Sequence, residues 1–260
     1  MLILTIDTSG AAVSAAVAET DMNTGRILSY FWLKHGKTHA EALMQCVDAA
    51  LAGLDLDIGG VDAFAAVSGP GSFTGLRIGL SVVKAFAYAS KALTAGISTL
   101  DALAQNMESY DSALLCPVMD ARRANVYTAI YMGGAVRLTE PAMLGVDETA
   151  ERLAAALEQN REIGRVVFNG DTAGQYIDFF RSKLRNAECV VAGADRMYQN
   201  AASAALLACG AASRGALVPP GELEPAYLNA GYMSRGAGGA ARAGNAANIA
   251  NTDRGNAGPV

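Results

Sequence analysis

The order of predicted elements occurs twice in this chain, and this repeat constrains the fold more than any other feature. Apolar and alternating runs predict strands in the first half at 2–6, 13–18, 27–32, 63–67 and 93–97, with helices at 38–53, 74–90 and 98–107. After a turn at 110–112 they predict strands at 114–119, 125–131, 136–144, 166–169 and 188–191, with helices at 147–158, 172–184 and 199–213. Both halves therefore have the order βββαβαβα, which predicts a duplicated α/β fold: two mixed sheets flanked by helices, with a cleft between them.

The repeat divides the chain into an N-terminal subdomain, residues 1–109, and a C-terminal subdomain, residues 110–232. A length of 260 residues with 52% hydrophobic content is sufficient for one large or two ordinary cores. From Gly236 onward the sequence is rich in Gly, Ala and Asn and nearly free of large apolar residues. Such a segment buries too little apolar surface to offset its ordering entropy, so we predict a disordered tail over 233–260.

A glycine-rich turn joins the strand at 63–67 to the helix that follows it. The stretch from Ser68 to Leu80 begins with Gly-Pro-Gly, and Ser72 or Thr74 can cap the helix N-terminus. Ser98 with Asp101, and Thr38 with Glu41, predict two further helix starts. The turn can hold an anion at the helix N-terminus, but it lacks the Lys of a P-loop and is weak support for nucleotide binding by itself.

Gly75 and Gly79 lie four residues apart, on one face of the predicted helix. Glycine in a helix interior costs roughly 1 kcal/mol relative to Ala, so close approach of another element should compensate. Two interpretations stay open: the helix packs tightly within its own domain, or it forms part of a subunit interface. In the second case a large residue at Gly79 should block pairing and leave the monomer folded.

Four short motifs resemble one family. They are Ile6-Asp7-Thr8, the run Gly-Pro-Gly-Ser-Phe-Thr-Gly-Leu-Arg-Ile-Gly at 69–79, Asp120-Ala121-Arg122 and Pro225-Ala226-Tyr227-Leu228. Together they resemble the TsaB (YeaZ) family over about residues 1–230. The resemblance implies the actin-like, sugar-kinase and Hsp70 (ASKHA) fold. The sequence departs from the family pattern at Ala124 and Asn125, where Gly-Glu is usual, and at Asn229, where Arg is usual.

The resemblance also implies a function. We expect a non-catalytic dimerisation or scaffold subunit of the complex that forms threonylcarbamoyladenosine beside the tRNA anticodon. It would pair with a TsaD-type threonylcarbamoyl transferase, with a TsaE-type ATPase as a further partner, and would form a homodimer when alone. The expected interface lies on the helices at 38–52 and 75–89, through His39, Leu43, Gly75, Leu76, Gly79, Val82, Val83 and Phe86. A net charge of −5 and the absence of an evident basic patch suggest that tRNA is contacted only indirectly.

Two turns carry the candidate phosphate contacts. Asp7, Thr8 and Ser9 follow the first strand of the first copy, and Asp120 and Arg122 occupy the equivalent turn of the second copy. Facing one another, the two turns would form a clamp for a nucleotide phosphate with Mg²⁺. The alternative is that these Asp residues only satisfy turn backbone groups. No cofactor of the chain's own is expected, although the resemblance allows ATP or ADP with Mg²⁺ at a subunit interface.

A second function from another class is an autonomous ATPase or phosphotransferase that uses Asp7 and Asp120. Against it, the resemblance places Thr99 and Leu103 where catalytic relatives carry two metal-binding histidines. The two histidines of this chain, His35 and His39, flank the start of a helix, and we expect no metal site there. The four cysteines are scattered through apolar segments, which favours buried free thiols.

The N-terminal residues lead directly into a predicted strand, and no run of 18 apolar residues occurs. We therefore expect a cytoplasmic protein with no membrane segment.

Overall fold

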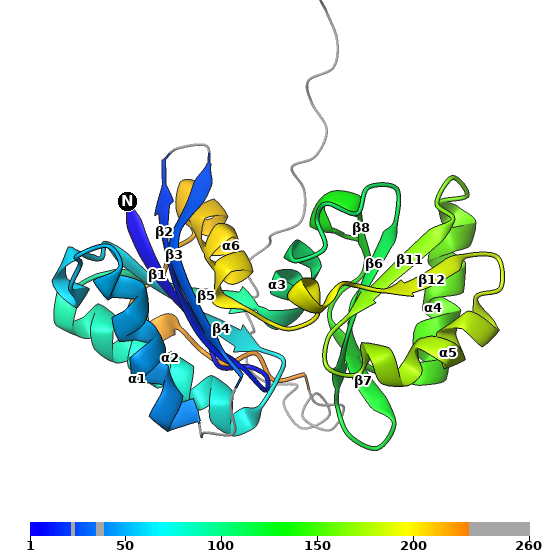
Figure 1. Ribbon diagram of the computed structural model, residues 1–260, viewed down its shortest axis with the longest axis horizontal. Helices are drawn as coiled ribbons and strands as arrows, with labels where there is room; N and C mark the ends of the chain where they lie inside the picture. The colour runs from blue at the N-terminus through cyan, green and yellow to red at the C-terminus, as the bar shows by residue number, and fades with distance from the viewer. Residues whose placement is uncertain (22–23, 35–38, 229–260) are drawn as a thin grey trace, which may run out of the picture. The chain divides into compact units, whose positions relative to one another are not determined.

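Two β-sheets with the same internal strand order form the framework of the computed structural model, which describes residues 1–21, 24–34 and 39–228 (Figure 1). The first sheet has the order β3-β2-β1-β4-β5. Its strands are β1 (Leu2–Asp7), β2 (Val13–Thr20), β3 (Gly25–Leu33), β4 (Ala63–Gly69) and β5 (Leu93–Ser98). β1, β2 and β3 pair antiparallel, whereas β4 and β5 run parallel to β1.

The second sheet repeats this plan. Its main path is β10-β7-β6-β11-β12, in which β6, β7 and β10 pair antiparallel and β11 and β12 run parallel to β6. The strands are β6 (Leu114–Asp120), β7 (Asn125–Thr128), β8 (Tyr131–Met132), β9 (Val136–Arg137), β10 (Ala142–Gly145), β11 (Arg165–Asn169) and β12 (Glu188–Val191). The duplication predicted from the sequence is therefore confirmed.

Two predicted strands of the second copy were wrong in their extent. The strand predicted at 125–131 is broken after Thr128, and the one predicted at 136–144 is divided into β9 and β10. The break occurs because the backbone of Ile130 turns away from the ladder: its N–H donates to Thr139 Oγ1, and its carbonyl accepts from the N–H groups of Leu138 and Thr139. The apolar residues continue without interruption in the sequence, so the sequence pattern gives no sign of this break.

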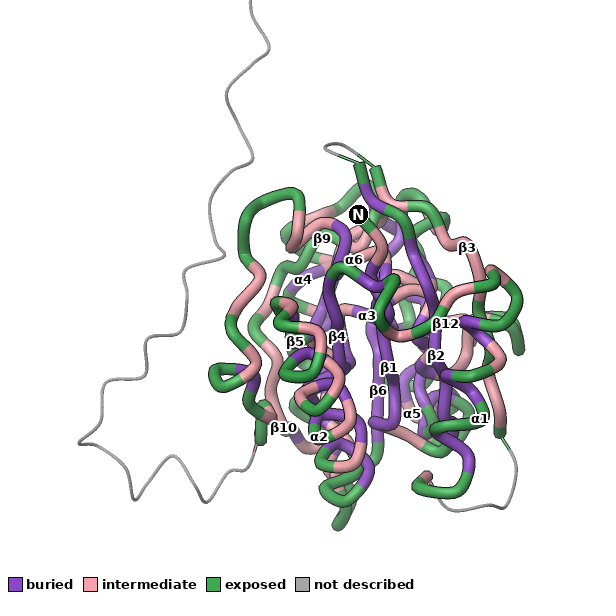
Figure 2. The backbone as a smooth tube through the Cα atoms, turned by 90° about the vertical axis from the view of Figure 1, so that its left-hand side faces the viewer, coloured by how far each residue is buried: buried purple, intermediate pink, exposed green. Residues whose placement is uncertain are grey.

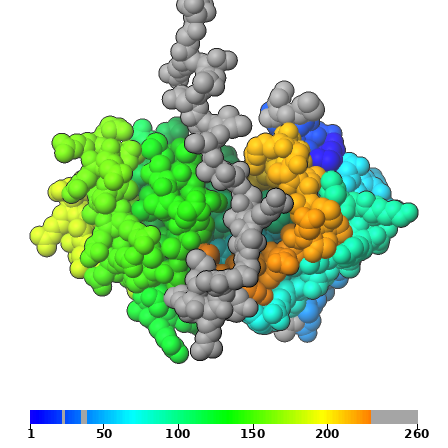
Figure 3. All heavy atoms as spheres, turned by 180° about the vertical axis from the view of Figure 1, so that it is seen from behind, coloured from blue at the N-terminus to red at the C-terminus, as the bar shows by residue number. Residues whose placement is uncertain are grey.

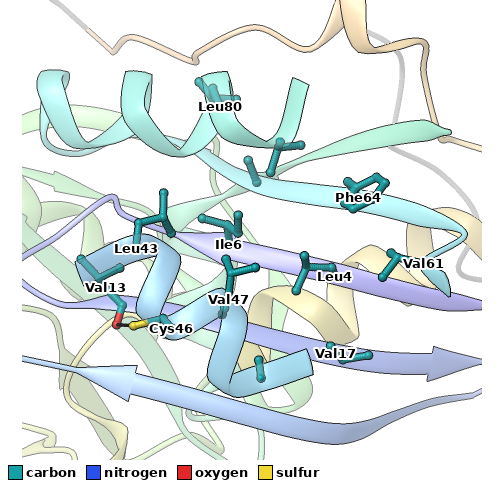
Figure 4. Packing of buried hydrophobic residues seen from close by; sticks show 14 of the residues in the cluster. Leu4, Ile6, Val13, Val17, Leu43, Cys46, Val47, Val61, Phe64 and Leu80 are labelled. Carbon is teal, nitrogen blue, oxygen red and sulfur yellow. Dashed lines mark hydrogen bonds between the residues drawn. The ribbon is translucent and has the colours of Figure 1, made fainter. Parts of the chain in front are cut away.

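The first face of the N-terminal sheet is covered by two helices of the same copy, α1 (His39–Ala52) and α2 (Phe73–Ser90). Between them and the sheet lie buried side chains that include Leu4, Ile6, Leu43, Val47 and Phe64 (Figure 4). The Ser72 hydroxyl accepts from the N–H of Gly75 and caps α2, as predicted. The capping box predicted at Thr38 lies outside the described residues.

The last helix of each copy packs against the sheet of the other copy. α6 (Ala201–Ser213) covers the second face of the N-terminal sheet, where its alanines contact Ile3, Ala16 and Ala65 (Figure 1, gold helix beside blue strands). α3 (Thr99–Gln105) places Leu100 and Leu103 in the core of the C-terminal sheet with Leu115 and Val167. α4 (Val146–Gln159) and α5 (Ala173–Lys183) cover the remaining face of that sheet.

This exchange buries the central strands on both faces, as Figure 2 shows in purple. Residues 1–228 form one compact unit. A boundary at 109/110 separates the two sheets but not their covering helices, and it stays a prediction, as does the boundary at 232. The tail predicted at 233–260 lies outside the described residues. Within the described ranges, no helix combines the length and apolar character needed to cross a membrane.

Candidate functional site

A cavity of about 400 Å³ lies where the first turns of the two copies meet. It is lined by residues of the turn after β1, of the turn after β6 and of the N-terminus of α2, together with Asp171. The structure therefore brings Ser9, Asp120 and Arg122 to one cavity, as the repeat predicts.

The turn after β1 directs most of its polar groups into the protein. Asp7 is buried, and one of its carboxylate oxygens accepts hydrogen bonds from the N–H and the hydroxyl of Ser9, at 2.9 and 2.7 Å. Its other oxygen has no hydrogen-bond partner among the described residues, and burial raises the pKa of this carboxyl. The buried Thr8 hydroxyl donates to the carbonyl of Gly75 at 2.7 Å. Of the three residues predicted here, only Ser9 lines the cavity.

The turn after β6 presents opposite charges. Asp120 accepts from the N–H of Arg122 at 2.8 Å and forms an exposed ion pair with its guanidinium at 3.3 Å. Arg122, Arg123 and Ala124 have φ values of 69°, 54° and 57°, so three consecutive non-glycine residues adopt the left-handed region. The Asn125 amide donates to the carbonyls of Arg122 and Arg123 and holds this turn together.

Asp171 is a cavity residue that the sequence reasoning missed. Its carboxylate accepts from the N–H of Asp120 at 3.0 Å, and burial together with the Asp120 charge raises its pKa. Its position two residues beyond β11 is the available signal, because β11 corresponds to β4 in the duplication and polar residues after such strands face the cleft. Two carboxylates therefore lie on the C-terminal side of the cavity.

The glycine-rich turn packs closely against two other segments: the turn after β1 and the segment that carries Ala226 and Tyr227. A Cβ atom on Gly69 would lie 2.4 Å from the carbonyl oxygen of Ala226, and one on Gly71 would lie 2.3 Å from that of Ser9. Tyr227 stacks on Phe73 with ring centroids 5.4 Å apart, and its hydroxyl accepts from Arg77 Nε. In Figure 3 the segment that carries Tyr227, in orange, lies beside α2, in cyan. These glycines therefore permit close backbone packing.

The interface residues predicted on α1 and α2 divide into two groups. Five of them, Leu43, Gly75, Leu76, Gly79 and Val83, are buried within the chain itself. The remaining three, His39, Val82 and Phe86, are half-buried, and His39 Nε2 lies 2.8 Å from the carbonyl oxygen of Gly10. A partner could not contact the first group in this conformation.

Gly79 requires a correction. A Cβ atom there would lie 2.4 Å from Thr8 Oγ1, and one on Gly75 would lie 2.1 Å from the Thr8 carbonyl oxygen. The compact helix face therefore packs within its own domain, the first of the two interpretations. A large residue at Gly79 would disturb the monomer itself, contrary to the expectation stated above.

The remaining candidates in the described part of the chain are buried. Thr99 and Leu103 are buried in the core, and Cys46, Cys116, Cys189 and Cys209 are free and buried. The described residues include no group of three or more His, Cys, Asp or Glu side chains that could hold a metal ion. His35 and Asn229 lie outside the described residues.

The duplicated sheets, with a cavity between their first turns, define a protein of the ASKHA class. The family model described as TsaD, tRNA N6-adenosine threonylcarbamoyltransferase, matches residues 34–213. The chain belongs to this family and, within it, to the TsaB (YeaZ) group that its motifs resemble.

Individual relatives agree with this assignment. The tRNA threonylcarbamoyladenosine biosynthesis protein TsaB of Bacillus subtilis (strain 168) is 34% identical over 131 residues, which cover 50% of this chain and 55% of the relative. TsaB of Escherichia coli (strain K12) is 33% identical over 132 residues, with the same coverage of 50% and 55%. The solved structure of YeaZ from Pseudomonas aeruginosa has a TM-score of 0.68 and 26% identity, and the match covers 87% of this chain and 100% of that one. The aligned segment thus spans about half the length of the curated relatives.

Proposed function

We propose that this chain is a non-catalytic subunit of the machinery that forms threonylcarbamoyladenosine in tRNA. It pairs with a TsaD-type transferase and supports transfer of the threonylcarbamoyl group to the adenosine beside the anticodon, with a TsaE-type ATPase as a further partner. Support for the pathway comes from the names of the TsaB relatives and from the description of the matching family model. Contact with tRNA is indirect and the site of action cytoplasmic in this proposal.

The proposed non-catalytic role rests on one observation, the buried hydrogen bonds made by the turn after β1. An autonomous phosphotransferase would need the Asp7 carboxylate and the Thr8 hydroxyl to face the cavity, but Asp7 is buried against Ser9 and Thr8 donates to Gly75. Releasing them requires breaking buried hydrogen bonds, each worth about 0.5–1.5 kcal/mol net and more where a charge is involved. The chemistry therefore resides in the partner.

The proposed docking surface is the outer side of α1 and α2. Met44 on α1 and Tyr88 on α2 are exposed large apolar residues, and Val82 and Phe86 are half-buried between the core and solvent. In this proposal these side chains form one apolar surface across the two helices, of the kind that marks protein interaction sites. We place the interface on these four residues together with His39, and the same surface supports a two-fold dimer when the partner is absent.

The ASKHA class implies binding of a nucleotide with Mg²⁺, and residues that line the cavity fit both the phosphate and the cation. The backbone N–H groups of Phe73 and Thr74, at the N-terminus of α2, would hold a phosphate, and the carboxylates of Asp120 and Asp171 would hold the cation. The metal would neutralise these two carboxylates, which otherwise repel a phosphate. We propose that ATP or ADP with Mg²⁺ binds here only when a partner completes the site.

The second candidate function, an autonomous ATPase or phosphotransferase, is favoured by the cavity that joins Ser9 to Asp120. Calorimetry of the isolated chain with Mg-ATP distinguishes this function from the proposed non-catalytic role. Micromolar binding with turnover would establish the second function, and absence of turnover is expected.

Pairing is tested by mixing the chain with its TsaD-type partner and measuring the mass of the complex by light scattering. Met44→Asp places a charge on the proposed surface, where the parent side chain is 42% exposed, and we expect loss of the heterodimer. The matched control is Val136→Asp, at a 58% exposed position on β9, which should pair normally. An unchanged complex mass for Met44→Asp would remove this surface from the interface.

A further inference from the structure

A second pocket, separate from the cavity between the turns, lies beside the edge strand β3 and has a volume of about 190 Å³. Its lining includes three aromatic side chains: Tyr30 and Trp32 of β3, and Tyr198 from the segment that leads from β12 to α6 (Figure 1). Tyr30 and Trp32 are two residues apart and therefore share one face of the strand. Asp195 and Asn200 supply polar groups at the same pocket.

Hydrogen bonds fix the positions of the segments that carry the aromatic residues of this pocket. The indole N–H of Trp32 donates to the carbonyl of Gln199 at 3.2 Å, and the Asn106 amide donates to the carbonyl of Tyr198 at 2.8 Å. The Asn200 side chain caps α6 by accepting from the N–H of Ser203, and it donates to Asn106. The rings are therefore carried by a preorganised backbone, which lowers the entropy cost of binding a ligand.

The size and charge of the pocket restrict its ligand. Its volume is below the roughly 300–1,000 Å³ of sites that enclose a whole drug-sized molecule, so it fits one ring system. Lys34 Nζ already lies 3.6 Å from the centroid of the Tyr198 ring, and the Asp195 carboxylate pairs with Arg196 at 3.5 Å. No unbalanced negative charge is left to attract a second cation. Among the described residues Lys34 has no carboxylate partner, so its ammonium group is available to an anion.

We propose that this pocket binds a nucleobase, stacked on the aromatic side chains, with the attached phosphate on Lys34. Stacking on aromatic rings beside a cation is how proteins bind unpaired bases. The Asp195 carboxylate, on a side chain 77% exposed, accepts from an exocyclic amino group, which favours adenine and cytosine over uracil. The base can come from a free nucleotide or from an unstacked position in an RNA. The proposal does not depend on the proposed function.

Trp32 is the single tryptophan of the chain, so its fluorescence reports directly on this pocket. The full chain is titrated with AMP, adenosine, UMP, a short single-stranded RNA and choline, with correction for ligand absorption. We expect saturable quenching by AMP, weaker quenching by UMP and none by choline. Saturation by AMP identifies a free nucleotide as a sufficient ligand, and saturation by the RNA alone identifies an RNA base. Absence of saturable quenching by every nucleotide and RNA overturns the proposal, and so does saturation by choline.

Substitutions at Tyr198 and Lys34 test whether the nucleotide binds in this pocket. Tyr198→Ala should raise the dissociation constant for AMP about tenfold, whereas Tyr198→Phe should retain binding. Lys34→Ala should weaken AMP and leave adenosine unchanged, because only AMP carries the phosphate. The matched control is Phe31→Ala, an exposed aromatic side chain on the opposite face of β3, which should bind as the parent does. Equal affinity in Tyr198→Ala and the parent would place the ligand elsewhere and reject the pocket. Measured pairing with the transferase is a separate readout, so the two proposals can fail independently.

Discussion

Gly75 and Gly79 have a specific reason to lack side chains, because Thr8 occupies the space beside both of them. The Thr8 hydroxyl donates to the Gly75 carbonyl while the Thr8 carbonyl lies where a Gly75 Cβ atom would be. These contacts join α2 to the end of β1 and set the position of the turn at the cavity. Two glycines in the first two turns of α2 thereby allow the end of β1 to pack closely against this helix.

Gly75→Ala should lower the free energy of unfolding by about 1–3 kcal/mol, because a backbone carbonyl must move to admit the methyl group. The matched control is Gly174→Ala in α5, where no atom lies within 4 Å of the added Cβ. That change should be neutral or stabilising by up to about 1 kcal/mol. Urea unfolding of both variants measures the two changes in the free energy of unfolding. Equal effects at the two positions would contradict the close contact with Thr8.

Asp7 should make stability depend on pH in the acid range. Its pKa is raised in the folded protein above the ordinary value of 3.8, so the folded state holds the proton to a higher pH than the unfolded state does. The free energy of unfolding therefore falls as pH rises from about 3.8 to the folded pKa, and is constant above it. Asp7→Asn should remove this contribution and gain stability over the parent as pH rises through that window.

Urea unfolding at several pH values measures the effect. Part of the slope should persist in Asp7→Asn, because the pKa of Asp171 is raised as well. Asp178→Asn, on an exposed side chain of α5, is the control. A pH profile of Asp7→Asn that parallels the parent would show that the Asp7 carboxyl titrates alike in both states.

At the scale of elements, α3 is attached to the second copy through Asp101. This carboxylate accepts from the hydroxyl of Tyr131 at 2.7 Å and from Arg137 Nε at 3.1 Å, and thereby connects α3 to β8 and β9. Tyr131 is among the largest fully buried side chains. Asp101 therefore satisfies a buried donor as well as a cation.

Asp101→Ala should lower the free energy of unfolding by about 2–3 kcal/mol, because the buried Tyr131 hydroxyl loses its acceptor and Arg137 loses its carboxylate partner. In the double variant with Tyr131→Phe the loss should be smaller than the sum of the single losses, since the two residues interact. Glu140→Ala, which removes a carboxylate 87% exposed that also pairs with Arg137, should change stability by less than about 0.5 kcal/mol. Strictly additive losses for Asp101 and Tyr131 would contradict the proposed contact.

The sequence predicted those elements whose signals are local. Ser72 and Ser98 cap the helices that they were expected to cap, and the repeat order placed the turns at Ser9 and Asp120 in one cavity. The exchange of α3 and α6 was not predictable, because an alanine-rich face fits either sheet and only three-dimensional packing selects one. The position of Asp171 after β11 was a usable signal, but its hydrogen bond to the backbone N–H of Asp120, 51 residues away, depends on packing.

At the scale of the whole molecule, the exchange of α3 and α6 joins the two copies within residues 1–228. The face formed by Ile3, Ala16 and Ala65 is covered by α6, from the far end of the chain. A fragment of residues 1–109 would expose that face to water, and we expect it to show no cooperative unfolding transition. Adding a separate chain of residues 110–228 should restore the transition, with residues 1–228 in one chain as the control. Circular dichroism with urea measures this, and independent cooperative folding of 1–109 would contradict it.

The placement of α6 also has a consequence during synthesis. The ribosome releases the strands of the first sheet early, yet their second covering layer is encoded at 201–213 and emerges only after the second sheet has been made. One apolar side of the nascent chain therefore waits for most of translation, at about 5–20 residues per second, before its native partner arrives. Chaperones have that interval in which to bind it.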